Sequence, residues 1–192
     1  NAKHLPWGVA FNESQRLAVK ADRTYYSNNE EGGQKGLSAA ISIALLSYRN
    51  YNTYNATQQE TNLNKVTDFA SSSYQRYQGE KLVKRFNAYS YVRLSEAMDS
   101  HNVARNRNEA VEHALATIKT KTLVVGISSD LLFPVTEQQF LAKHIPNAQY
   151  NEIDSFYGHD GFLLETKQLT DVIKQFYSSS KTNINKKHFS LI

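Results

Sequence analysis

Two strand-like runs near the end of the chain, each followed by a short polar loop, constrain its fold most. Residues 122–127 (Thr-Leu-Val-Val-Gly-Ile) precede Asp130, and residues 149–153 (Gln-Tyr-Asn-Glu-Ile) precede His159. The segment between these loops has room for one helix and one strand, which is typical of neighbouring parallel strands. The carboxyl ends of such strands lie at one edge of a sheet. We therefore expect Asp130 and His159 to lie side by side.

The surrounding pattern predicts an α/β fold built from parallel strands with flanking helices. We expect helices over 109–118, 137–144 (with Thr136 as N-cap) and 167–177, around the two strands. Residues 109–178 would form this core segment, and 179–192 a flexible tail. Parallel sheets are buried on both faces, so two strands are too few. We expect the remaining strands to precede residue 1.

Residues 1–108 differ in composition and pattern. They are rich in Tyr, Asn, Gln and Ser, and their apolar residues recur at helical spacing. We expect helices over about 7–21, 37–48, 72–86 and 90–98, a polar loop or broken helix over 50–68, and no strand. This region is interpreted as a helical lid, or cap, inserted into the sheet domain.

Asp130 and His159 are of the types that form the acid and base of a serine-dependent catalytic triad. In α/β-hydrolases the triad follows the chain order Ser, Asp, His. No Gly-x-Ser-x-Gly sequence occurs here, so the nucleophile is missing and we expect the chain alone to be inactive. The alternative is that Asp130 begins a turn and His159 caps a loop. Asp160 could likewise bind a substrate ammonium or cap a helix.

Composition narrows the function classes. The 192 residues carry a net charge of +4 and no cysteine, which excludes disulfides and thiolate metal sites. The other histidines lack metal-ligand spacing, so no metal is expected. No basic stripe indicates nucleic acid, no apolar run indicates a membrane, and without a targeting segment cytoplasm is the default. The mild positive charge could favour an anionic substrate such as a coenzyme A ester.

Several strings together resemble the homoserine O-acetyltransferases, over nearly the whole chain. They include Trp7–Glu13, Leu46–Arg49, Tyr77–Lys81 with Arg85-Phe86, and Ala97–His101, and they continue through Ser129–Pro134 and Tyr157–Asp160. The resemblance implies the C-terminal part of an α/β-hydrolase fold carrying an inserted helical lid. It also implies a methionine-biosynthesis enzyme that moves acetyl from acetyl-CoA to L-homoserine, without a bound cofactor, as a homodimer formed by the lid.

The same resemblance implies the roles of four residues. Asp130 and His159 would be the triad acid and base, Asp160 would contact the homoserine amine, and Tyr48 would line the acyl tunnel. The mechanism would be ping-pong: an upstream serine takes the acetyl group, CoA leaves, and the homoserine hydroxyl attacks the acyl-enzyme.

Three positions depart from the family pattern. Ile41 stands where an arginine is usual, and Asn87 and Tyr89 stand where Asp and Asn are common. They put the substrate in doubt. Open alternatives are therefore a succinyl donor, serine as acceptor, water as acceptor in an esterase, or a non-catalytic dimerisation module.

Overall fold

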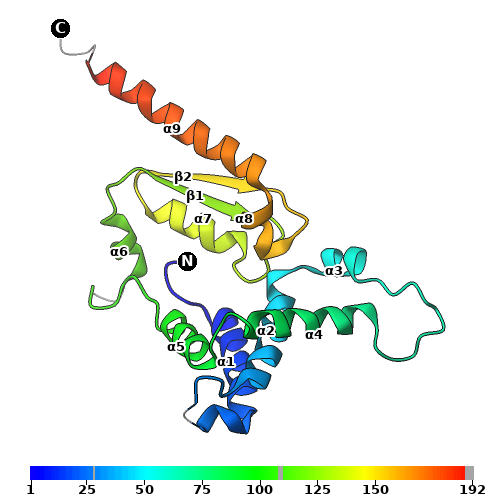
Figure 1. Ribbon diagram of the computed structural model, residues 1–192. Helices are drawn as coiled ribbons and strands as arrows, with labels where there is room; N and C mark the ends of the chain where they lie inside the picture. Colours follow the sequence, from blue (N-terminus) through cyan, green and yellow to red (C-terminus); the bar gives the residue numbers. More distant parts are fainter. Residues whose placement is uncertain (28, 108–109, 189–192) are drawn as a thin grey trace.

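The computed structural model describes residues 1–27, 29–107 and 110–188, with side chains through residue 179. The first part contains α1 (Pro6–Ala21), η1 (Arg23–Tyr26), α2 (Gln34–Tyr48), α3 (Tyr51–Thr57), α4 (Ala70–Val83) and α5 (Ala88–Asp99). The second contains α6 (Val111–Ala116), β1 (Thr122–Ile127), α7 (Val135–His144), β2 (Ala148–Ile153), η2 (Gly158–Asp160), α8 (Gly161–Leu164) and α9 (Thr166–His188). Figure 1 shows the helices of the first part below the two strands, with α9 extending away above them.

The helical part has its own small core where α1, α2 and α5 pack together. Val19, Leu37 and Ala40 are fully buried there, and Ala88 and Val92 join them from α5. Helices α1 and α2 approach closely because Gly36 has no side chain; a Cβ at that position would lie 2.6 Å from the Cα of Val19. This packing makes the expected lid region a folded helical unit.

A buried ion-pair network ties α1 to α5 beside that core. Nη2 of Arg16 lies 2.6 Å from carboxylate oxygens of both Glu13 and Asp99, and Nη1 donates to Oγ of Ser95 at 3.2 Å. The Arg16 side chain is only 8% exposed. A buried guanidinium requires such partners, because an unpaired charge in the interior is costly.

In the described part of the chain, the sheet has two strands, β1 and β2, which pair in parallel. Thr122 pairs with Ala148 at one end and Ile127 with Ile153 at the other. The parallel arrangement and β1 itself are confirmed, and β2 begins one residue earlier than expected. Because the two strands end in register, the loops carrying Asp130 and His159 leave the sheet at the same edge.

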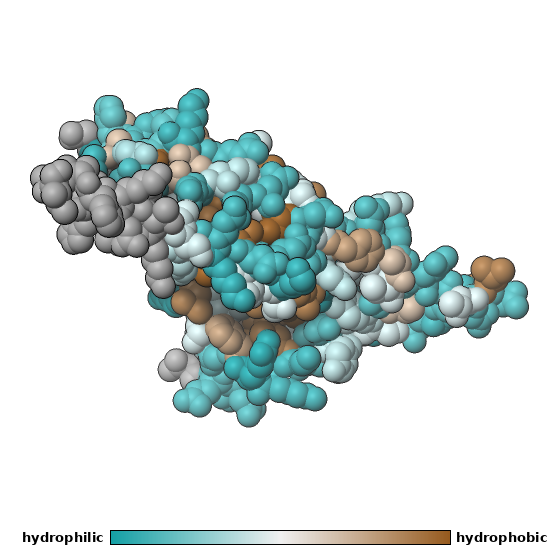
Figure 2. All heavy atoms as spheres, turned by 90° about the horizontal axis from the view of Figure 1, so that it is seen from above, coloured by the Kyte–Doolittle hydropathy of each residue, from teal (hydrophilic) through white to brown (hydrophobic). Residues whose placement is uncertain are grey.

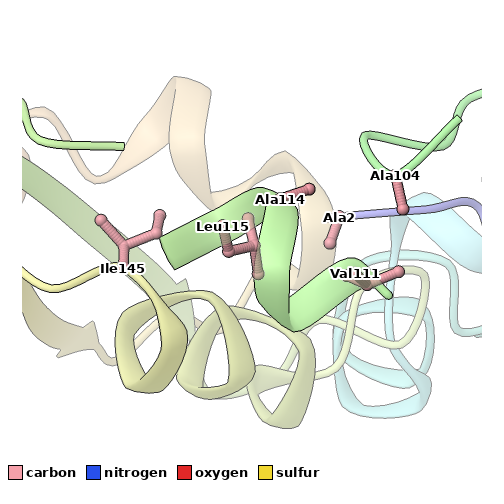
Figure 3. Close-up of a cluster of buried hydrophobic side chains, with 6 residues drawn as sticks. All are labelled: Ala2, Ala104, Val111, Ala114, Leu115 and Ile145. Carbon is pink, nitrogen blue, oxygen red and sulfur yellow. The ribbon is translucent and has the colours of Figure 1, made fainter. Parts of the chain in front are cut away.

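A second hydrophobic cluster joins the chain's first residues to the sheet segment (Figure 3). Its buried members are Ala2, Ala104, Val111, Ala114, Leu115 and Ile145. Lys3 and Asn102 form an isolated antiparallel bridge nearby, although no strand pairing was expected before residue 108. The first residues therefore pack with the α/β segment. The boundary at 108 stays a prediction, since residues 108 and 109 lie outside the described residues.

Two expectations about helix ends are wrong. Helix α7 begins at Val135, with Pro134 in the N-cap position, so Thr136 lies inside the helix and is not its cap. Proline is well suited to a helix start because it has no N–H to leave unpaired. Helix α9 continues from Thr166 to His188 and does not end at Tyr177. The expected flexible tail, 179–192, thus begins within this helix; residues 189–192 lie outside the described part.

No helix in the described ranges is both long and apolar enough to cross a membrane.

Candidate active site

Asp130 lies in the loop directly after β1, with 8% of its surface exposed. Its Oδ1 accepts hydrogen bonds from the backbone N–H groups of Leu132 and Phe133, at 2.8 and 2.9 Å. These two bonds orient the carboxylate and leave Oδ2 facing the neighbouring loop. Asp130 thus does begin a turn, and its second oxygen remains available for another partner.

That partner is His159 in η2. Its Nδ1 lies 2.8 Å from Oδ2 of Asp130, and the imidazole side chain is 24% exposed. A carboxylate on Nδ1 holds the proton there and turns the lone pair of Nε2 outward, as a general base requires. The structure brings the two residues together as expected; their catalytic roles remain predictions.

Aromatic rings surround this imidazole on several sides. The ring centroids of Phe133 and Phe162 lie 5.3 Å from that of His159, and the Tyr48 centroid lies 5.8 Å away. Burial raises the pKa of Tyr48, and the charge of Asp160 raises it further, so its hydroxyl is neutral at ordinary pH. The structure thus places Tyr48 beside the acid–histidine pair. Phe133 and Phe162 were not singled out, because an aromatic residue in a sequence usually indicates only packing.

Two serines fasten the strand-end loops to each other. Ser129 Oγ donates to the backbone oxygen of Ser155 at 2.5 Å and accepts from the backbone N–H of Gly158 at 3.1 Å. Ser128 Oγ donates to Oδ1 of Asp154 at 2.8 Å, nearer the solvent. These bonds fix the loop of the acid against the loop of the histidine.

The lid contacts the histidine loop at a left-handed glycine. Gly158 has φ +65°, and a Cβ there would lie 2.9 Å from the carbonyl carbon of Arg49 and 3.0 Å from the backbone oxygen of Tyr48. Glycine meets both demands because it tolerates positive φ and has no Cβ. The end of α2 therefore packs directly on η2.

A second anchor comes from the start of α3. Asn50 caps this helix by accepting from the N–H of Thr53 at 2.9 Å, and its Nδ2 donates to the backbone oxygen of Phe156 at 3.0 Å. The Thr53 hydroxyl also donates to that oxygen. Trp7 of α1 adds a third link, from Nε1 to the backbone oxygen of Leu131 at 2.7 Å. The helical part thus contacts both loops of the site.

Asp160 points toward the lid, where Arg49 meets it. Nη1 of Arg49 lies 3.2 Å from Oδ2 of Asp160. The pKa of Asp160 lies above its ordinary value because burial outweighs the opposing charges of Arg49 and His159. Asp160 caps no helix with its side chain. Sequence reasoning gave Arg49 no role, although it belongs to one of the strings that carry the resemblance.

Of the three departures, Ile41 and Tyr89 lie on helices of the first part of the chain, and Asn87 lies at the N-cap of one. Asn87 caps α5 by accepting from the N–H groups of Tyr89 and Ser90, and Tyr89 donates its hydroxyl proton to the backbone oxygen of Tyr25 at 2.5 Å. Asn87 and Tyr89 thus have structural contacts among helices. Ile41 lies on α2, two turns before Tyr48. Its match to an arginine position stays a prediction.

Among the residues described, no cluster of three or more His, Cys, Asp or Glu side chains could hold a metal. Within that same part of the chain, the hydrogen bonds of His159 include no Ser or Thr hydroxyl. The geometry brings together a carboxylate and an imidazole, with the carboxyl group of Asp160 next to them.

Comparison with known proteins shows which proteins this chain is similar to. No protein-family model matches the chain. A protein named homoserine O-acetyltransferase from Cyclobacterium marinum is 48% identical over 177 residues, which are 92% of this chain and 50% of that relative. Over nearly all of its length the chain is similar to proteins named homoserine O-acetyltransferase. It spans about half the length of the curated relatives that it matches.

Similar solved structures identify the fold of the chain. The homoserine O-acetyltransferase of Bacillus anthracis matches with a TM-score of 0.82 at 17% identity, over 92% of this chain and 50% of that one. The esterase E22 matches with a TM-score of 0.80 at 18% identity, over 91% and 51%. At these identities the likeness shows the fold alone. It confirms that the helix-rich chain with its small parallel sheet is part of an α/β-hydrolase fold.

Proposed function

We propose that the gene product containing this chain is a homoserine O-acetyltransferase, which moves an acetyl group from acetyl-CoA to L-homoserine in methionine biosynthesis. The observation that carries the proposal is the Asp130–His159 pair, joined at 2.8 Å where two parallel strands end. The 48% identity to a protein of that name supports this activity among those of the fold.

In this mechanism His159 is the general base and Asp130 its orienting acid. Nε2 of His159 takes the proton of a serine hydroxyl, supplied by a segment outside this chain, as the serine oxygen attacks the thioester carbonyl. The tetrahedral intermediate collapses to acetyl-serine, and CoA leaves with the proton returned by His159. His159 then takes the proton of the homoserine hydroxyl as that oxygen attacks the carbonyl of acetyl-serine. The bond from the acetyl carbon to the serine oxygen breaks, O-acetyl-L-homoserine leaves, and His159 returns the proton to the serine oxygen.

Asp160 and Tyr48 would shape the acceptor site beside His159. The carboxylate of Asp160 is the anionic group next to the base, which suits the ammonium group of homoserine. The neutral Tyr48, with its ring 5.8 Å from the imidazole, would line the tunnel that the acyl group enters. No bound cofactor is part of this scheme, because the thioester supplies the driving force.

The lid would also form a homodimer. Large apolar side chains are exposed on its helices, including Leu17, Leu46, Leu94 and Met98. Figure 2 shows apolar surface between polar patches and at the far end of the loop between α3 and α4, where Leu63 and Val66 are exposed. Exposed apolar area of this kind is typical of interaction sites. Light scattering of the purified gene product should give twice the monomer mass. A cytoplasmic location completes the proposal, and cell fractionation tests it.

The test is CoA release from acetyl-CoA by the native gene product, with and without L-homoserine. Release that requires homoserine supports the transferase. Release with water alone would indicate an esterase, and release from succinyl-CoA or with serine in preference would indicate one of the related transferases. This chain by itself should be inactive; turnover that survives His159→Ala would contradict the assigned roles.

Two variants and two matched controls test the roles. We expect Asp130→Asn and His159→Ala to lower the turnover by about 10³-fold or more, as with other triads. Asp171→Asn and His113→Ala alter the same residue types on exposed helix faces. They should leave the turnover unchanged.

A further inference from the structure

The contact between Arg49 and Asp160 joins the lid to the catalytic loop. Arg49 caps the C-terminus of α2, and Asp160 directly follows His159. Their side chains are 22% and 17% exposed, and Nη1 and Oδ2 are 3.2 Å apart. An ion pair this shielded from water is stronger than one on the surface.

Arg49 is itself held in place by its surroundings. Its backbone N–H donates to the backbone oxygen of Leu45 at 3.1 Å, and its backbone carbonyl packs against Gly158. Its Nη2 donates to the Tyr74 hydroxyl at 3.4 Å. It lines a cavity of about 180 Å³ together with Tyr54, Tyr74, Tyr157 and three polar residues of α3 and its end. A guanidinium fixed in this way can fix the carboxylate that it pairs with.

The charges around Asp160 explain why it requires such a partner. Asp160 is flanked by His159 on η2, Asp130 on the loop after β1, and Tyr48 and Arg49 on α2. Burial and the negative charge of Asp130 raise the pKa of Asp160, whereas Arg49 and His159 lower it. Without Arg49, Asp160 would take up a proton more readily or turn toward His159 and compete with Asp130.

We propose that Arg49 is a positioning residue that holds the Asp160 carboxylate beside His159, where it can bind the ammonium group of an amino-acid acceptor. This inference rests on the proposed function. The guanidinium of Arg49 contacts Asp160 and Tyr74, so it acts on the site through Asp160. It acts in the second half-reaction, where the acceptor binds, and not in the first, where the enzyme is acetylated.

The first test uses the native gene product with Arg49→Gln, Arg49→Lys and, as control, Arg93→Gln on an exposed pair of α5. We expect Arg49→Gln to raise the KM for L-homoserine about 10- to 100-fold, the loss of a hydrogen bond to a charged group. The rate of enzyme acetylation, measured as the burst of CoA release, should stay within about twofold. Arg49→Lys should restore part of the KM, and Arg93→Gln should match the wild type.

Non-additivity gives a sharper criterion. Arg49→Gln combined with Asp160→Asn should be no worse than Asp160→Asn alone, because both changes remove the same interaction. Additive effects, or an equal loss of acetylation and acceptor use, would mean that Arg49 supports only the fold and would overturn the proposal.

A second readout needs no substrate. The side-chain carboxyl of Asp160, followed by ¹³C NMR, should titrate at higher pH in Arg49→Gln than in the wild type, with Arg93→Gln unchanged. An unmoved titration would overturn the proposal even in an active transferase. A moved titration without homoserine-dependent CoA release would sustain the role of Arg49 and refute the proposed function.

Discussion

The hydroxyl of Ser129 accepts a hydrogen bond from the backbone N–H of Gly158 at 3.1 Å, and so links the loop of the acid to the loop of the histidine. The same hydroxyl donates to the backbone oxygen of Ser155. One side chain thereby satisfies two backbone groups of the neighbouring loop. We expect this link, together with their own hydrogen bond, to keep Asp130 and His159 next to each other.

Ser129→Ala should therefore weaken the site without removing a catalytic group. The change leaves the N–H of Gly158 and the carbonyl of Ser155 without their partner, which costs about 1–2 kcal/mol. We expect a lower melting temperature and a lower turnover. Ser128→Ala, which removes an exposed bond to Asp154, should change stability by less than about 0.5 kcal/mol. Equal effects of the two variants would show that the hydrogen bonds of Ser129 stabilise the site no more than the exposed bond of Ser128 does.

Gly158→Ala should disturb the contact between the lid and the histidine loop. The backbone there has φ +65°, and the new Cβ would meet the carbonyl carbon of Arg49 at 2.9 Å. Strain of this kind costs about 1–3 kcal/mol, so unfolding by urea should begin at lower concentration and homoserine turnover should fall. Gly126→Ala is the control, because its Cβ would meet only the end of the Tyr150 side chain, which can move. A wild-type unfolding curve for Gly158→Ala would contradict the packing described.

Arg16→Met should destabilise the lid. It removes the cation between Glu13 and Asp99, both 2.6 Å away, and leaves Asp99 (18% exposed) with fewer partners. We expect a loss of about 2–4 kcal/mol in the free energy of unfolding, moderated because Glu13 is half exposed. Arg93→Met, which removes an 84% exposed side chain paired with Glu96, should cost almost nothing. Similar losses for both would show that burial of the network does not matter.

The loop between α3 and α4 should loosen in acid. Glu60 accepts hydrogen bonds from Lys65 and from the N–H groups of Asn62 and Ala70, and these lower its pKa from 4.5 to about 2. A carboxyl with a lowered pKa in the folded state stabilises that state above pH 4.5, and the contribution is lost as the pH falls toward about 2. Amide exchange of residues 58–70, corrected for intrinsic rates, should rise over this range. In Glu60→Gln it should already be fast at higher pH and show no such transition.

The contribution of Asp160 to stability depends on pH in the opposite direction to that of Glu60. Burial raises its pKa, so the folded state binds its proton more tightly than the unfolded chain does. Its contribution to stability is therefore greatest below its unfolded pKa of 3.8 and declines as the pH rises through the folded value. The ionised form of Asp160 therefore destabilises the folded state, because its carboxylate is partly buried. This is consistent with a role in binding a cation.

The sequence by itself determined the two strands, the parallel sheet and the adjacency of Asp130 and His159. Apolar runs of strand length, ended by polar loops and separated by one helix, admit few other arrangements. The helices α1, α2, α4 and α5 were likewise readable, because apolar residues recur at the helical period. The ends of helices were harder to predict. Thr136 is a good cap by residue type, yet α7 starts one residue before it, after Pro134.

Only the tertiary structure decided which lid residues reach the site. Arg49 and Asp160 lie far apart in the sequence, and their pairing depends on the end of α2 packing on Gly158, which no local pattern encodes. The ring cluster of Phe133, Phe162 and Tyr48 around His159, and the Ser129 link between the loops, arise in the same way. Periodicity reports which face of an element is buried, whereas contacts between elements depend on how their side chains fit, and that is settled only in the folded chain.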